Sequence, residues 1–112
     1  MTANDVARVV KEALASYRPP LTAEETLGTP WSLDRIQEEL RLLKAALVLP
    51  SRRTLLAHEQ PDAEAWLVAL DGEYAIYFDE PSGEFGLGGL QEDGSISSWG
   101  IYGDLPGTFM AR

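Results

Sequence analysis

The sequence predicts an α+β fold in which helices come first and an antiparallel sheet follows. Residues 1–50 carry apolar side chains at helical spacing, interrupted by prolines, whereas residues 54–105 form short runs with the two-residue period of strands. Connectors rich in Gly, Asp and Pro separate these runs and are typical of hairpin turns. We therefore expect two main N-terminal helices and a short helical turn, packed on one face of a meander of four or five strands.

The chain is expected to form a single domain over 1–112, with a helical part over 1–50, the sheet over 54–105 and a tail over 106–112. A domain of 112 residues buries roughly two-thirds of the surface that its unfolded chain exposes, which suffices for one core. Apolar residues make up 45% and charged residues 24%. This composition is typical of a folded globular domain rather than a disordered chain.

The first helix is expected over about 3–18. Thr2 and Asp5 provide a capping signal at its start, and Pro19-Pro20 cannot continue it. Its apolar residues recur at intervals of three and four and so share one stripe: Val6, Val9, Val10, Ala13, Leu14 and Tyr17.

A short helical turn and a second long helix are expected next. Thr22 and Glu25 have the form of a capping box, and Gly28 closes this turn. Ser32 is suited to cap the long helix, which Pro50 is expected to end. The predicted buried stripe of the long helix consists of Leu33, Ile36, Leu40, Leu43 and Leu47.

Five strands are predicted in the second half of the chain. Tyr74 and Ile76 share one face of their strand and Ala75 and Tyr77 the other, so both faces of the sheet have apolar content. We expect the helices to cover only one of them. The predicted strands are 54–59, 65–70, 73–78, 84–90 and 95–102, with turns at 71–72, 81–83 and 93–94.

Negative charge is concentrated in the sheet. Residues 54–111 contain eleven carboxylates and no Lys or Arg, whereas residues 1–53 contain eight basic and seven acidic side chains. The net charge of the chain is −9. Such a surface attracts basic proteins and can speed their association by roughly 10- to 1,000-fold, whereas it repels the phosphates of DNA and RNA.

The sequence therefore predicts a non-catalytic, acidic protein-binding domain that neutralises or escorts a basic protein. Small acidic inhibitors of nuclease toxins, as in immunity and antitoxin proteins, are one setting for this physics, and DNA mimicry is a special case of it. Aromatic side chains ringed by acids suit an interface, because interfaces are enriched in Tyr and Trp. The predicted partner-binding residues are Asp71, Glu73, Asp79, Glu80, Glu84, Glu92, Asp93, Trp99 and Tyr102.

Two alternatives from other classes stay open. The apolar spacing over 32–47 is compatible with a homodimer, and hence with a self-associating accessory subunit, although fewer than three heptads favour a core helix. A pocket on the sheet face with Tyr77, His58 and one carboxylate is compatible with a small-ligand-binding domain or an enzyme.

Familiar catalytic and metal-binding motifs are absent from the sequence. There is no Cys, His58 is the only histidine, and no G-x-S-x-G is present. The glycines over 86–89 lack the helix and the Lys-Ser/Thr pair of a phosphate loop, and the acids over 79–84 lack the spacing of a calcium loop. We therefore expect no catalytic residue, no cofactor and no metal.

A cytoplasmic location, in a bacterial type of protein, is expected. Charged residues between Asp5 and Glu12 interrupt any apolar core of a signal peptide. No run approaches the roughly 18 apolar residues that span a bilayer, so we expect no membrane association.

Overall fold

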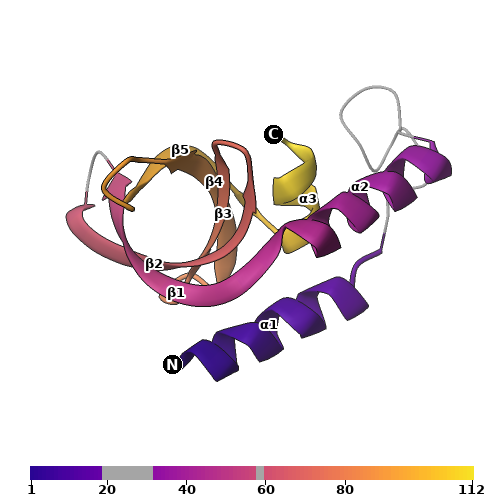
Figure 1. Ribbon diagram of the computed structural model, residues 1–112. Helices are drawn as coiled ribbons and strands as arrows, with labels where there is room; N and C mark the ends of the chain where they lie inside the picture. Colours follow the sequence, from indigo (N-terminus) through magenta and orange to yellow (C-terminus); the bar gives the residue numbers. More distant parts are fainter. Residues whose placement is uncertain (19–31, 58–59) are drawn as a thin grey trace.

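The structure, a computed structural model, is α+β as predicted (Figure 1). It describes residues 1–18, 32–57 and 60–112. The predicted helical turn over 22–28 and His58 lie outside these residues. The elements are α1 (Ala3–Ala15), α2 (Leu33–Ala46), β1 (Leu47–Ala57), β2 (Gln60–Asp71), β3 (Tyr74–Asp79), β4 (Glu84–Leu90), β5 (Ile96–Gly103) and α3 (Leu105–Met110).

The five strands close into a barrel. Each strand pairs antiparallel with the next in sequence, and β1 pairs parallel with β5 at Leu55–Ile96 and Leu56–Ser97. In an up-and-down meander with an odd number of strands, the first and last strands run in the same direction, so closure has to be parallel. The expectation of a sheet with one uncovered face is therefore wrong, because the second face forms the interior of the barrel.

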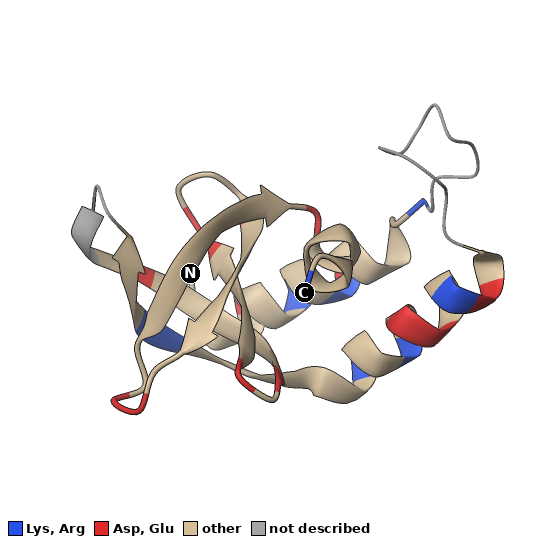
Figure 2. Cartoon of the chain, turned by 90° about the horizontal axis from the view of Figure 1, so that it is seen from above, with Lys and Arg blue, Asp and Glu red and all other residues tan. Residues whose placement is uncertain are grey.

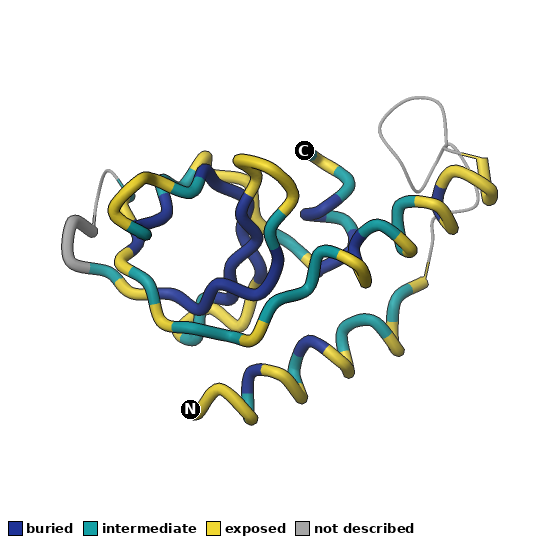
Figure 3. The backbone as a smooth tube through the Cα atoms, in the orientation of Figure 1, coloured by how far each residue is buried: buried dark blue, intermediate teal, exposed yellow. Residues whose placement is uncertain are grey.

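Alternation along the strands fills two separate cores. On β3, Ile76 and Phe78 face the helices, whereas Ala75 and Tyr77 face the barrel interior. In Figure 3 the buried positions follow the barrel wall and the helix faces turned towards it. The interior core contains Leu55, Ala65, Leu67, Ala75, Tyr77 and Ile96.

The first helix is shorter than predicted. Thr2 and Asp5 form the expected capping box, but the helix ends at Ala15 and Ser16 caps it. The Ser16 hydroxyl and amide both donate to the carbonyl of Glu12, at 2.8 and 2.9 Å. Tyr17 therefore lies beyond α1.

The second helix passes directly into β1. It ends at Ala46, and β1 begins at Leu47 rather than at Thr54. Pro50 thus lies within a strand, at a register shift between Leu47 and Ser51 where a missing N–H is tolerated. Arg52 is consequently part of the barrel.

The segment expected as a tail contains a third helix. The Asp104 side chain caps α3 by accepting from the amide of Gly107 at 3.3 Å. Leu105 and Phe109, four residues apart, are both buried against the outer barrel wall with α1 and α2. The helical layer is therefore built from both ends of the chain (Figure 1).

The predicted hairpin turns are confirmed. They contain Gly72, Gly83 and Gly94 at φ values of 61°, 72° and 89°, a region that favours glycine. Figure 2 shows the acidic residues of the sheet mostly at such turns, whereas α2 carries both signs of charge.

Candidate functional site

Two exposed aromatic side chains contact each other on the outside of the barrel. Tyr74 at the start of β3 and Trp99 on β5 pack edge to face with ring centroids 5.6 Å apart. Their residues remain 39% and 47% exposed. Tyr and Trp combine large apolar area with a polar group and few rotatable bonds, which suits them to protein interfaces.

Gly89 on β4 provides the surface on which Trp99 lies. It pairs with Tyr74 on one side and with Ser97 on the other. A Cβ at Gly89 would lie 3.1 Å from Cζ2 of Trp99, closer than an ordinary contact. The indole can thus approach the β4 backbone because this residue has no side chain.

Two of the predicted acids lie in turns at the same end of the barrel as the start of β3, where Tyr74 lies, and are free. Glu73 directly precedes Tyr74, and its carbonyl accepts from the amide of Leu90 at 3.1 Å, which joins the β2–β3 turn to the end of β4. Glu92 lies in the adjoining β4–β5 turn. Both are exposed, and neither makes a side-chain hydrogen bond or ion pair with another described residue. We call Glu73, Tyr74, Glu92 and Trp99 the aromatic–acidic face.

Four other predicted acids already have partners within the chain. Asp79 accepts from the Ser82 hydroxyl at 2.6 Å, and Asp93 accepts from the amide and hydroxyl of Ser95 at 2.9 and 2.6 Å. The Ser95 hydrogen bonds lower the pKa of Asp93. The two remaining contacts are Asp71 with Arg112 at 2.7 Å and Glu80 with the indole N–H of Trp66 at 2.5 Å.

Glu84 is also exposed and free, but it lies at the other end of the barrel. Turns of a meander alternate between the two ends, so the β3–β4 turn lies opposite the turns that carry Glu73 and Glu92. The structure therefore does not bring all of the predicted site residues together.

Tyr102 belongs to a cluster of hydroxyl groups that includes the interior Tyr77. Ser98 Oγ lies 2.8 Å from the Tyr77 hydroxyl and 3.2 Å from that of Tyr102. The two rings pack edge to face at 6.1 Å. Burial raises the pKa of Tyr77 well above its ordinary value, and Tyr102 and Asp79 act in the same direction, although the Ser98 hydrogen bond opposes them. Tyr77 is thus protonated at neutral pH and is no general base there.

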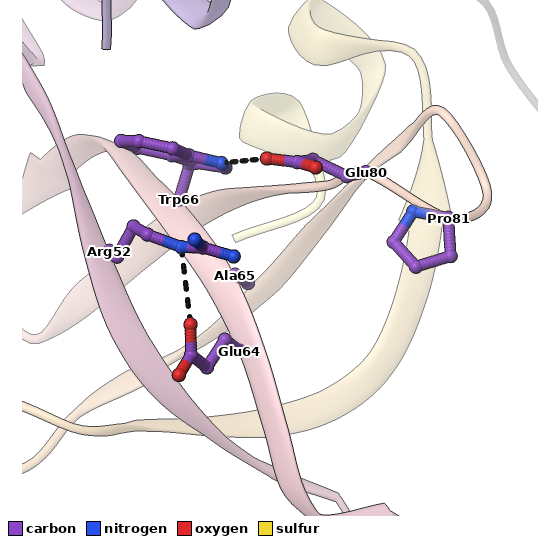
Figure 4. Close-up of a pocket in the computed structure, with 6 residues that line it drawn as sticks. All are labelled: Arg52, Glu64, Ala65, Trp66, Glu80 and Pro81. Carbon is purple, nitrogen blue, oxygen red and sulfur yellow. Dashed lines mark hydrogen bonds and ion pairs between the residues drawn. The ribbon is translucent and has the colours of Figure 1, made fainter. Parts of the chain in front are cut away.

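A hollow of about 440 Å³ lies beside Trp66 (Figure 4), and Glu80 is the one predicted site residue among those that line it. Arg52 Nε lies 3.1 Å from Glu64 Oε2, and its guanidinium carbon lies 5.4 Å from the centre of the Trp66 ring. Glu80 lines the opposite side and accepts from the indole (Figure 4). Sequence reasoning missed this cluster because it placed Arg52 before the sheet. Its charged groups already have partners, so it offers no free charge to a ligand.

A larger groove of about 680 Å³ lies between the end of α1, the β3–β4 turn and the start of α3. Glu12, Glu84 and Asp104 line it together with Arg18 and with apolar residues that include Phe85. Burial, followed by the charge of Asp104, raises the pKa of Tyr17 at its wall. The groove has more negative than positive charge, in keeping with the acidic character of the barrel.

Neither a metal-binding cluster nor a membrane-spanning helix was found in the described part of the chain. No three His, Cys, Asp or Glu side chains within 1–18, 32–57 and 60–112 are arranged to hold a metal ion. None of the helices in these ranges is long and apolar enough to cross a membrane. No protein-family model, curated protein or solved structure matches the chain.

Proposed function

We propose that the chain is a non-catalytic, acidic protein-binding domain that docks on a basic protein and neutralises or escorts it. A basic toxin or nuclease is the kind of partner that such an acidic surface would attract. The observation that carries the proposal is the aromatic–acidic face, in which a packed, exposed Tyr74–Trp99 pair and two free, exposed carboxylates belong to β3, β5 and the turns at one end of the barrel.

Each part of this face has a distinct role in the proposal. Trp99 and Tyr74 supply apolar contact area, which slows dissociation of the partner. Glu73 and Glu92 attract cationic side chains and speed association, because exposed charges act over roughly 10 Å at 0.1 M salt. Residues 54–111 contain no Lys or Arg. The two arginines of β1 already have other partners: Arg52 pairs with Glu64, and Arg53 donates to Ser51 Oγ and to the carbonyl of Gly94 in the β4–β5 turn.

A second candidate function is self-association through α2. Leu33 of the predicted stripe is 55% exposed, whereas Ile36 and Leu43 are buried. Leu40 and Leu47 are partly buried, so among the described residues of the stripe Leu33 is the one most available to a second copy.

Charge reversal on the purified protein tests the leading proposal. The probe is the most abundant basic protein that the immobilised chain retains from source-cell lysate at low salt. Glu73→Lys and Glu92→Lys should each weaken its binding about tenfold at low salt and by less at high salt. Glu84→Lys is the matched control, since it changes a free carboxylate at the opposite end of the barrel. Equal effects at all three positions, or none, would contradict the proposal.

A further inference from the structure

Among the described residues, strand β5 has a neighbouring strand on only one side over most of its length. It pairs with β4 from Ile96 to Gly103, but with β1 only at Ile96 and Ser97. From Ser98 onwards, β5 continues past the end of β1. Within the described ranges, residues 98–103 therefore form a strand edge with no strand on the β1 side.

This edge is exposed and apolar. Trp99, Ile101 and Tyr102 are 47%, 37% and 45% exposed. An exposed edge presents unpaired backbone N–H and C=O groups and is a template for a further strand. Proteins commonly block such edges with Lys or Pro, but 98–103 contains neither. The edge is irregular at the register shift around Gly100, which has a φ of 75° and whose amide donates to Ser98 Oγ at 3.3 Å.

We propose that the β5 edge over 98–103 binds an extended segment of the basic partner by adding it to the barrel as a strand. The inference rests on the proposed function and specifies how the partner is recognised. In strand addition, backbone hydrogen bonds supply affinity and alternate side chains supply specificity. Trp99 belongs both to this edge and to the aromatic–acidic face, so one segment can contact both.

The carboxylates near the β5 edge favour a basic segment over a second copy of the chain as the added strand. Asp104 directly follows the edge, and the charge of Asp79 acts on Tyr77, which packs against Tyr102. A second β5 would bring the same carboxylates close to these, and like charges facing each other are unfavourable. A segment with Lys or Arg beside β-branched residues pairs with the same edge without that repulsion.

Selection from a displayed library of random decapeptides tests this inference. We expect wild-type protein to enrich peptides that alternate apolar or β-branched residues with Lys or Arg. The best peptide is then N-methylated at one residue at a time. At every second residue the methyl group should weaken binding about tenfold, because it removes one backbone hydrogen bond to β5, whereas methylation of the intervening residues should change the affinity little. Ile101→Lys should abolish enrichment. Leu56→Lys is the matched control, because it also replaces an exposed aliphatic residue with Lys, but on β1, where Leu56 pairs with Ser97 of β5.

The outcomes separate the strand mode from the proposed function. If N-methylation shows no two-residue period while Glu73→Lys and Glu92→Lys still weaken the partner protein, strand addition is wrong and the aromatic–acidic face remains. Equal enrichment by wild type and Ile101→Lys, or none by wild type, would overturn the inference. So would sedimentation showing a dimer that Ile101→Lys dissociates, since the occupant would then be a second copy.

Discussion

The ring of Tyr77 occupies the space directly over Gly86 on the neighbouring strand. The two residues pair across β3 and β4, and a Cβ at Gly86 would lie 2.3 Å from Cζ of Tyr77. Gly88 likewise faces inward, where a Cβ would lie 2.3 Å from the carbonyl oxygen of Ser97. A five-stranded barrel has little room inside, so one large side chain requires a strand with little or none opposite.

Gly86→Ala should therefore lower the free energy of unfolding by about 2–3 kcal/mol. Tyr77→Leu alone should also destabilise, because it leaves a cavity, but the double variant should cost at least about 1 kcal/mol less than the sum of the two. Urea denaturation of the four proteins measures this coupling. Gly103→Ala is the control, since a Cβ there meets only Thr108 Oγ1, at 3.7 Å. Strict additivity of the two changes would contradict the packing.

Arg112 links three elements and should contribute to stability. It lies 2.8 Å from Glu39 on α2 and 2.7 Å from Asp71 on β2, and its guanidinium carbon is 3.8 Å from the Phe109 ring centre. The Arg112 and Glu39 side chains are only 12% and 16% exposed. Arg112→Ala should cost about 1–3 kcal/mol in urea denaturation. Arg41→Ala breaks an exposed pair with Glu38 and should therefore change stability much less, and a similar loss at both positions would refute this distinction.

Thr108 should tolerate the loss of its hydroxyl. The residue is buried in α3, and Oγ1 has no hydrogen-bond partner among the described residues. Thr108→Val keeps the shape and removes the unpaired polar group, so stability should be unchanged or rise by about 1 kcal/mol. Thr108→Ser keeps the hydroxyl but loses a methyl group and should cost about 1 kcal/mol. Thermal denaturation ranks the three proteins, and a Val variant less stable than the Ser variant would show that the hydroxyl is bonded.

Alkaline pH should destabilise the fold through Tyr77. Burial raises its pKa in the folded state above the unfolded value of about 10. Above that pH the unfolded chain loses a proton that the folded chain keeps, so stability should fall by up to about 1.4 kcal/mol per pH unit. Tyr77→Phe should be less stable at neutral pH but should show a shallower decline above pH 10. Denaturation between pH 8 and 12 gives both slopes, and identical slopes would contradict the assignment.

Local signals in the sequence predicted most of the elements but not the closure of the barrel. The alternation of Ile76 with Tyr77 and the positions of Gly72, Gly83 and Gly94 depend on neighbouring residues, so they could be read directly. Closure depends on the pairing of Leu55 with Ile96. These two residues lie far apart in the sequence, so no local pattern encodes their contact. Pro50 is a further obstacle, because a proline after a helical pattern predicts a helix end, whereas here it occupies a strand irregularity.

The sequence predicts the chemical character of the candidate site but not which residues belong to it. The absence of Lys and Arg over 54–111 and the aromatic content are properties of the sequence itself. Which acids remain free depends on the fold, because Asp71 meets Arg112 and Glu80 meets Trp66 only in the folded chain. The third helix could have been found from the Asp104 cap and the four-residue spacing of Leu105 and Phe109.

The most direct test of the central claim is a comparison of two affinity columns loaded with the same source-cell lysate at low salt. One carries the wild-type chain and the other carries the triple variant Glu73→Gln, Glu92→Gln and Trp99→Ser, with folding of both checked by circular dichroism. The account predicts that the wild-type column retains one basic protein in stoichiometric amount, released by raised salt, and that the variant column loses it. Equal retention of that protein by both columns, or no stoichiometric basic protein on either, would contradict the account.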